Sequence, residues 1–244
     1  MRNVIVTGGS RGLGLAMARR LAGAGYRVIA IARNDTDELA AASRTAAASG
    51  MGEIAFRTAD LSRIEKLPAL MRALRADYGA IYGLINNAGS GTGGVLGLMR
   101  DGEIERLVRL NMLASIVLAK YAARSMMTAR TGRIINIASI TAFTGYRGLS
   151  VYSATKASLV GFTRSLAREF GPLGITVNAI APGFIDTDMT HALSESDRET
   201  IRRRSALGRL AEPDDVARSA EFLLGDGGRN ITGTVLTVDA GNTA

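Results

Sequence analysis

The stretch NVIVTGGSRGLGLAMARRLAG, residues 3–23, decides the fold. Its start is an apolar, β-branched run typical of a buried parallel strand, and its second half has the alanine and leucine content of a helix. Between them lie Gly8, Gly12 and Gly14, and glycine permits a tight turn and a close approach of the backbone to a ligand. The N-terminus of the following helix would then offer free N–H groups to a pyrophosphate. A tight βα turn without a ligand is the alternative, but its place after the first strand of a parallel sheet favours a nucleotide.

Outward from this stretch, apolar runs alternate with helical stretches along the chain. Strand-like runs occupy residues 26–32, 53–60, 82–89, 132–139, 175–183 and 234–241. They are apolar throughout, as expected of parallel strands that are covered on both faces. This alternation predicts an α/β fold with a single doubly wound, Rossmann-type parallel sheet of about seven strands and helices on both faces. Residues 1–244 are expected to form one NAD(P)-binding domain, with a polar substrate lid at about 186–210.

Composition excludes several classes of function. The chain has no cysteine, which excludes disulfides and thiol nucleophiles, and we expect no metal site. No apolar run reaches the ~20 residues that cross a bilayer, and the N-terminus leads straight into a strand, so a cytoplasmic protein is expected. The formal net charge is +8, but the arginines are spread along the chain beside acids, which argues against nucleic-acid binding. An acidic substrate or carrier protein suits this charge better.

The end of the second strand indicates which nucleotide would bind. NAD-binding sheets usually end that strand with an acid for the ribose 2′-hydroxyl, whereas an arginine favours a 2′-phosphate. Arg33 follows the strand here, and Arg11 in the glycine turn is a second candidate cation, so NADP is predicted. In the competing interpretation Asp35 is the ribose acid, but Asp35 with Glu38 is better explained as an N-cap and capping box of the next helix. The turn lacks G-K-[ST], which disfavours ATP hydrolysis.

Tyr152 and Lys156 offer acid–base chemistry in a chain whose single histidine, His191, lies in the predicted lid. The two residues are four positions apart and share one face of a predicted helix. A positive charge about 4 Å away, at an effective dielectric near 20, is worth roughly 4 kcal/mol, which would lower a tyrosine pKa by about three units. Such a phenol could protonate a ketone oxygen, or accept the proton in reverse. Taken alone, such a pair is more often ordinary helix surface.

Two further polar residues lie where a site would form. Ser139 ends the run at 132–139 and should lie at the carboxyl edge of the sheet, where its hydroxyl could donate to a substrate carbonyl. A capping serine is the alternative. Asn111 lies inside an otherwise amphipathic helix, and a solvent-facing or back-bonded asparagine is its alternative.

In combination, these residues resemble the short-chain dehydrogenase/reductase family over nearly the whole chain. TGGSRGLG at 7–14 is similar to the family's cofactor turn, NNAG at 86–89 to its signature after the fourth strand, and PGFIDTDM at 182–189 to the segment that closes on the nicotinamide. The resemblance implies a catalytic tetrad. In it Tyr152 donates the proton, Ser139 polarises the carbonyl, Lys156 binds the ribose and lowers the tyrosine pKa, and Asn111 holds a water.

The resemblance also implies which residues contact the cofactor. Asp60 matches the acid that contacts the adenine ring, and Ile185 and Thr187 would lie near the carboxamide. The full implied set is Gly8, Gly9, Ser10, Arg11, Gly12, Leu13, Gly14, Arg33, Asp60, Leu61, Asn87, Ala88, Gly89, Tyr152, Lys156, Pro182, Gly183, Ile185 and Thr187.

Within the family, residues 183–241 most resemble the 3-oxoacyl-[acyl-carrier-protein] reductases of fatty acid biosynthesis. The resemblance implies that NADPH reduces the 3-keto group of a β-ketoacyl thioester on an acidic acyl carrier protein, in a homotetramer built on helices near 98–129 and 150–171. Arg130 matches a basic position that meets the carrier, whereas Leu173 stands where a second is expected, and the glycine-rich segment 90–105 departs from the usual pattern.

Two alternatives stay open at this point. The same chemistry could act on acetoacetyl-CoA, a polyketide intermediate, a sugar or a small alcohol. The chain could also be a non-catalytic dinucleotide-binding regulator on the same fold.

Overall fold

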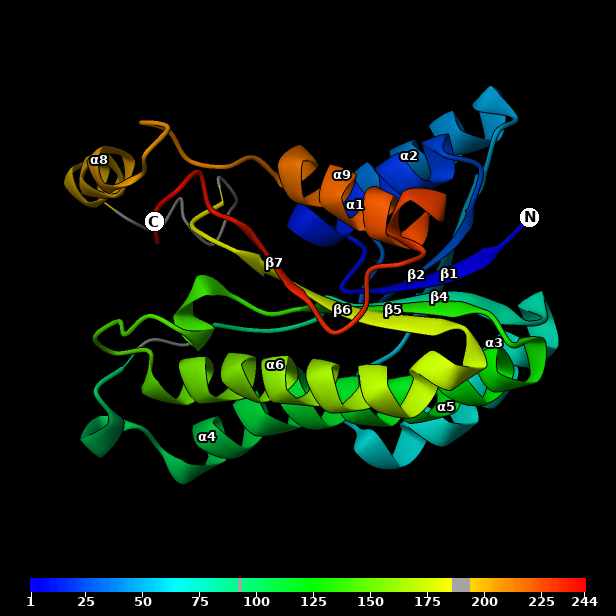
Figure 1. Cartoon of the computed structure of the whole chain (residues 1–244), viewed down its shortest axis with the longest axis horizontal. Helices are drawn as coiled ribbons and strands as arrows, with labels where there is room; N and C mark the ends of the chain where they lie inside the picture. The colour runs from blue at the N-terminus through cyan, green and yellow to red at the C-terminus, as the bar shows by residue number, and fades with distance from the viewer. Residues whose placement is uncertain (92–93, 186–193) are drawn as a thin grey trace.

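The computed structural model describes residues 1–91, 94–185 and 194–244. In this part of the chain seven strands form one parallel sheet in the order β3-β2-β1-β4-β5-β6-β7 (Figure 1). The strands are β1 (Asn3–Thr7), β2 (Arg27–Ala32), β3 (Glu53–Thr58), β4 (Ile81–Asn86), β5 (Gly132–Ile137), β6 (Ile175–Pro182) and β7 (Val235–Val238). The predicted doubly wound α/β sheet is thereby confirmed.

Helices cover both faces of the sheet. The described helices are α1 (Gly12–Gly23), α2 (Asp37–Ser49), α3 (Leu67–Tyr78), α4 (Asp101–Val108), α5 (Ala114–Ala129), α6 (Ser150–Phe170), α8 (Glu195–Arg204) and α9 (Pro213–Leu224). One face carries α1, α2 and α9, and the other carries α3, α5 and α6 (Figure 1). None of the described helices combines the length and apolarity that a membrane crossing requires.

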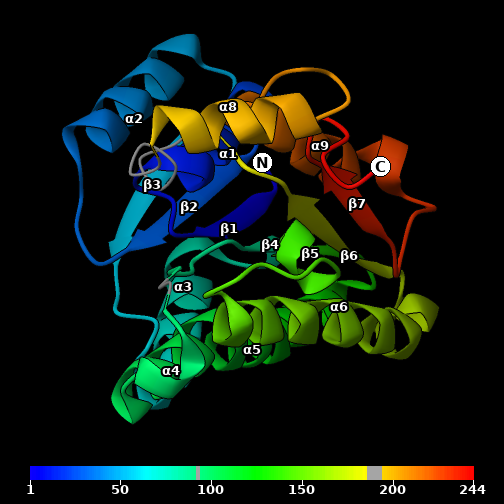
Figure 2. The ribbon, with the colours of Figure 1, turned by 90° about the vertical axis from the view of Figure 1, so that its left-hand side faces the viewer.

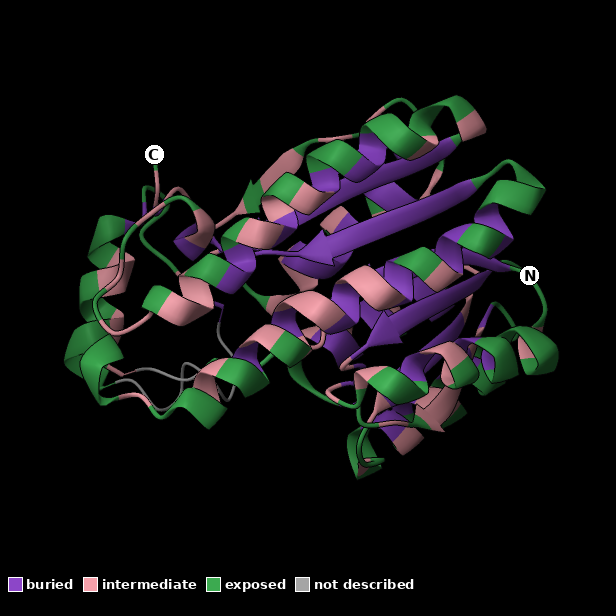
Figure 3. Ribbon diagram, turned by 90° about the horizontal axis from the view of Figure 1, so that it is seen from below, coloured by how far each residue is buried: buried purple, intermediate pink, exposed green. Residues whose placement is uncertain are grey.

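The strands are apolar on both sides because each side meets its own layer of helices. Val4 and Val6 pack with α1 and α9, whereas Ile5 between them packs with α3 and α5, and all three are fully buried. Figure 3 shows the sheet as a buried centre between helices that are exposed on their outer sides. This explains why the strand runs lack the alternation of a one-sided sheet.

The strand order reverses between β1 and β4, and in open α/β sheets this switch point is where ligands bind, beyond the carboxyl ends of the strands. Figure 2 looks onto this carboxyl edge, with α8 on one side of it and α4 on the other. The glycine turn and the polar residues that end β4 and β5 therefore belong to one edge of the molecule.

The start of α2 corrects one expectation. Thr36, not Asp35, is the N-cap: its Oγ1 accepts the N–H of Leu39 at 3.1 Å, while Asp35 accepts the N–H of Thr36 at 2.7 Å. The capping box of Asp35 with Glu38 is wrong because the helix begins one residue later. The Thr36 hydroxyl also donates to the Ser10 carbonyl at 2.7 Å, which ties α2 to the glycine turn.

Candidate active site

The glycine turn after β1 fits a phosphate group. A Cβ on Gly14 would lie 2.1 Å from the Gly8 carbonyl oxygen, so this glycine is required for the helix to pack against the turn. Gly12 differs, because its φ is +52° and an added Cβ would meet nothing within 4 Å. The N-cap position, Arg11, makes no side-chain cap, and the first turn of α1 contains no acid. The N–H groups of Gly8 and Gly9 donate to the Ile31 carbonyl, so it is the N–H groups at the start of α1 that are available to an anion such as a dinucleotide pyrophosphate.

Arg33 and Asp60 lie close together beyond β2 and β3. Both side chains are exposed, as is Arg11. Asp60 accepts the backbone N–H and the hydroxyl of Ser62, at 3.0 and 2.7 Å. These hydrogen bonds, aided by the charge of Arg33, hold the pKa of Asp60 below its usual value. The structure thus brings an arginine and an ionised carboxylate together beyond the carboxyl ends of β2 and β3.

The end of β4 is tied to the end of β1 by Thr7, a residue that sequence reasoning missed. The Thr7 hydroxyl accepts the backbone N–H groups of Asn87 and Ala88, each at 2.9 Å, and donates to the Ile85 carbonyl at 3.2 Å. The Asn87 amide donates in turn to the Thr7 carbonyl at 2.8 Å. The Asn87 side chain therefore holds the NNAG segment against the end of β1, where the glycine turn begins.

Ser139 and Tyr152 meet at the carboxyl edge. Ser139 follows β5 and is buried; its Oγ accepts the N–H of Thr141 at 3.2 Å. Tyr152 is on the first turn of α6 and shares a hydrogen bond with the Ser139 side chain. Burial raises the pKa of Tyr152, and the bond with Ser139 works in the opposite direction. Two hydroxyl groups are thus brought to one point, as reduction of a carbonyl group needs.

Lys156 is buried one turn further along α6. Its Nζ donates to the Ile137 carbonyl at 2.7 Å and lies 5.7 Å from the centre of the Tyr152 ring. Burial lowers the pKa of Lys156 from 10.5 to about 8. The pair does share one face of the helix, but the depressed tyrosine pKa expected from the sequence is not what this structure has. The reason is that desolvation of the phenol outweighs the effects that favour its charged form.

Asn111 is buried in a π-helical turn, Arg109–Leu113, that interrupts the path from α4 to α5. Such turns are rare and occur often at functional sites. The Asn111 amide accepts the N–H of Ser90 at 3.0 Å and donates to the Ser90 carbonyl at 3.0 Å and to Thr155 Oγ1 at 3.2 Å. A Cβ on Gly89 would lie 3.3 Å from Asn111 Oδ1 and 3.5 Å from Lys156 Nζ, so the two side chains border the same glycine. Protein groups occupy both N–H groups of the amide, and one lone pair of Oδ1 is left for a water.

The segment after β6 is held by the C-terminal strand. Gly183 donates its N–H to the Val238 carbonyl at 2.9 Å, and a Cβ on it would lie 2.6 Å from the Cβ of Asp239. Ile185 is buried and forms an isolated bridge with Ala211. Of the other sequence-predicted residues here, Thr187, Asp186, Met189 and His191 lie outside the described residues.

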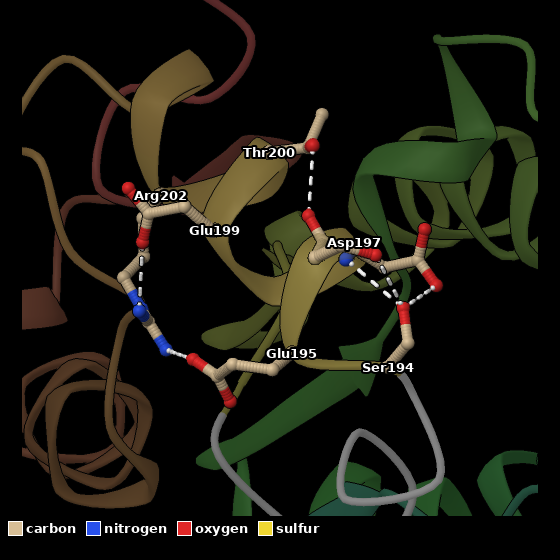
Figure 4. Close-up of polar contacts among 7 residues, drawn as sticks. Ser194, Glu195, Asp197, Glu199, Thr200 and Arg202 are labelled. Carbon is tan, nitrogen blue, oxygen red and sulfur yellow. Dashed lines mark hydrogen bonds and ion pairs between the residues drawn. The ribbon is translucent and has the colours of Figure 1, made fainter.

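The described part of the predicted lid contains α8. Ser194 caps this helix by accepting the N–H of Asp197 at 3.1 Å, and Arg202 pairs with Glu195 and Glu199 at 2.7 and 2.8 Å (Figure 4). The end of α8 is held by hydrogen bonds from Asn242.

Asn242 connects α8 with the segment between Ser139 and Tyr152. Its Nδ2 donates to Ser205 Oγ at 3.3 Å and to the Ile201 carbonyl at 3.4 Å. Its Oδ1 accepts a hydrogen bond from the Tyr146 hydroxyl at 3.3 Å. The C-terminal residues thus join the helix of the predicted lid to the segment that carries the candidate catalytic hydroxyls.

Four large apolar side chains, here called the apolar rim, are exposed on the two segments that follow NNAG and Ser139. Its members are 53, 54, 84 and 50% exposed, in the order Val95, Leu96, Leu98 and Phe143. The first three follow NNAG and the last follows Ser139, and the two segments are joined by a hydrogen bond from the Gly94 N–H to the Gly148 carbonyl at 2.8 Å. Large apolar side chains exposed on segments that leave the carboxyl edge are available to an apolar ligand or partner there.

Comparison with known proteins is consistent with this geometry. A family model described as short chain dehydrogenase matches residues 2–198. The 3-oxoacyl-[acyl-carrier-protein] reductase FabG of Escherichia coli (strain K12) is 40% identical over 237 residues, which are 97% of this chain and 95% of that protein. The Chlamydia trachomatis protein of the same name is 37% identical over 240 residues, 98% of this chain and 96% of that one.

A solved structure agrees with these relatives. A mutant of a Serratia marcescens short-chain dehydrogenase/reductase superposes with a TM-score of 0.92 at 32% sequence identity, and the match covers 100% of this chain and 98% of that one.

Proposed function

Because this chain belongs to the short-chain dehydrogenase family, whose members are nicotinamide-dependent oxidoreductases of CH–OH and keto groups, we propose that it reduces β-ketoacyl thioesters with NADPH. The thioester is carried by an acyl carrier protein, and the product is the 3-hydroxyacyl thioester. The names of the relatives at 37 to 40% identity support this substrate class.

The roles of the candidate residues follow from where their polar atoms lie. Reduced nicotinamide supplies the hydride when bound. Tyr152 gives its phenolic proton to the carbonyl oxygen, which needs the neutral phenol that burial favours. Ser139 donates a hydrogen bond to the same oxygen as charge develops on it, and the buried ammonium of Lys156 stabilises the phenolate that is left.

The apolar rim is the observation that carries the substrate class. Val95, Leu96, Leu98 and Phe143 are large apolar side chains exposed on the two segments that follow NNAG and Ser139, where they are available to an apolar ligand. An acyl chain gains free energy on such a surface, about 25 cal/mol per Å² of apolar area that it removes from water. A sugar would instead need hydrogen-bond donors and acceptors there, so the rim favours an acyl substrate over a sugar.

The test is a substrate panel in which NADPH oxidation is followed by absorbance. We expect turnover of a β-ketoacyl-carrier substrate, weaker turnover of its CoA analogue and little turnover of sugars or simple ketones. Tyr152→Phe should lose most of the turnover while still binding NADPH, measured by fluorescence. Absence of turnover with every β-ketoacyl thioester would refute the substrate class, and full activity of Tyr152→Phe would refute the acid.

NADP is the cofactor in this proposal, since Arg33 and Arg11 are exposed guanidinium groups at the positions that would meet a 2′-phosphate. Arg33→Ala is expected to weaken NADPH binding about tenfold or more while NADH binding changes little, because the charge-assisted contact exists only with the 2′-phosphate. Arg44→Ala, an exposed arginine on α2, is the matched control. An unchanged ratio of the two dissociation constants in Arg33→Ala would contradict this assignment.

A further inference from the structure

Thr155 lies between the two candidate catalytic residues of α6 and is only 2% exposed. Its hydroxyl has one proton, which it donates to the Tyr152 carbonyl oxygen at 2.7 Å. With that proton used, Thr155 Oγ1 can only accept from any other neighbour. The neighbour is the Asn111 amide, whose Nδ2 lies 3.2 Å away.

These bonds determine the orientation of the Asn111 amide. A backbone N–H can only donate, so the Ser90 N–H at 3.0 Å must face Asn111 Oδ1. Thr155 Oγ1 can only accept, so it must face Nδ2. Both constraints agree, and flipping the amide would set donor against donor at Ser90 and leave Thr155 Oγ1 facing an oxygen. Asn111 is thus hydrogen-bonded to Ser90 in the segment after β4 and to Thr155 on α6, which together fix the orientation of its amide.

The result is a chain of three hydrogen bonds that crosses the site. It runs from Ser90 through Asn111 and Thr155 to the Tyr152 carbonyl. It therefore joins the segment after β4, the π-helical turn and the helix that carries the candidate acid. The buried Thr155 hydroxyl is the link in this chain between the Tyr152 backbone and the Asn111 amide.

We propose that Thr155 is a positioning residue that holds the catalytic turn of α6 on the π-helical turn through Asn111. This inference rests on the proposed reduction by Tyr152. Misplacement by about 1 Å far from the reacting atoms can cost about 100-fold in rate, so loss of this bond should lower turnover more than it alters cofactor binding.

The test compares Thr155→Val, which keeps the branched shape and removes the hydroxyl, with Thr155→Ser, which keeps the hydroxyl. We expect kcat for the best thioester of the panel to fall about tenfold or more in Thr155→Val, with the dissociation constant for NADPH unchanged within about twofold. Thr155→Ser should recover most of kcat. Ser158→Ala is the matched control, because Ser158 makes the same kind of bond to the Thr155 carbonyl, at 2.7 Å, and should keep full kcat.

The outcomes separate this inference from the proposed function. Wild-type kcat in Thr155→Val, with Tyr152→Phe inactive, would overturn the positioning role and leave the function standing. A loss of kcat that Thr155→Ser does not restore would also overturn it.

Crystal structures of the ligand-free variants provide a test that needs no substrate. The Asn111 amide is expected to move away from α6 in Thr155→Val and to keep its place in Thr155→Ser. Unchanged positions of Asn111 and Tyr152 in Thr155→Val would overturn the proposal, even if no thioester proved to be a substrate.

Discussion

Lys156 is a buried amine, and burial disfavours the charged form that its proposed role in the site requires. Its ammonium loses water and gains one hydrogen bond, to the Ile137 carbonyl. The resulting fall in its pKa from 10.5 to about 8 corresponds to about 3 kcal/mol at ~1.36 kcal/mol per unit. Burial of this ammonium therefore destabilises the fold, while it places a positive charge 5.7 Å from the centre of the Tyr152 ring.

The pH dependence of stability should reveal this penalty. Below pH 8 both the folded and the unfolded chain carry the Lys156 proton, so the penalty is constant. Between about 8 and 10.5 the unfolded chain holds a proton that the folded protein has lost, so stability rises with pH. The free energy of unfolding of the wild type should therefore gain up to about 3 kcal/mol over that of Lys156→Met across this window.

Urea denaturation of the ligand-free proteins from pH 7 to 10.5 measures this difference. Lys66→Met, at an exposed lysine, is the control and should show a constant difference from wild type. A constant difference for Lys156→Met as well would show that the buried amine carries no such penalty.

Helix α1 shows how one element contains glycines of different kinds. Gly14, near its start, packs against the Gly8 carbonyl and the Asn87 amide, whereas Gly23, at its end, has nothing within 4 Å of an added Cβ. Either glycine lowers the helix propensity, but only an added Cβ at Gly14 would meet neighbouring atoms. The start of α1 is therefore the part of the element that depends on tertiary packing.

Alanine substitutions should separate the two cases. Gly14→Ala is expected to lower the free energy of unfolding by about 1–3 kcal/mol or more and to abolish NADPH binding, because the added Cβ would meet backbone 2.1 Å away. Gly23→Ala should be neutral or stabilise by up to about 1 kcal/mol and bind NADPH normally. Thermal denaturation and cofactor titration of both variants check this, and equal effects at the two positions would contradict it.

The charge of the whole molecule bears on its partner. A net charge of +8 would attract the acidic carrier protein of the proposed function from a distance, and salt would screen this attraction with a Debye length of about 8–10 Å at physiological ionic strength. Arg130 is one exposed contributor; it ends α5 in the left-handed region at φ 49° and donates to the Pro172 carbonyl at 3.1 Å.

Salt should therefore distinguish carrier-bound from small substrates. We expect kcat/KM for a β-ketoacyl-carrier substrate to fall several-fold between about 0.05 and 0.5 M NaCl, mainly through KM, because long-range attraction speeds association. A neutral small-molecule thioester with the same acyl group should change less than about twofold. The same salt dependence for both substrates would argue against an acidic carrier as partner.

The pattern of the sequence determined the architecture of this protein. Runs such as 3–7 and 81–86 are apolar without alternation, and this local property already requires helices on both sides of a parallel sheet. The glycine turn, and the place of Ser139 after an apolar strand, follow from local order in the same way. These features were predictable because each depends on residues that are neighbours along the chain.

Only the tertiary structure decided what several of these residues do. The Asn111 amide meets Ser90 and Thr155, 21 and 44 positions away, and Thr7 meets Asn87, 80 positions away. The pKa of Tyr152 is raised rather than lowered because burial, which depends on every packed neighbour, dominates it. Hydrogen-bond partners and desolvation arise between segments that only folding brings together, so spacing along the chain does not determine them.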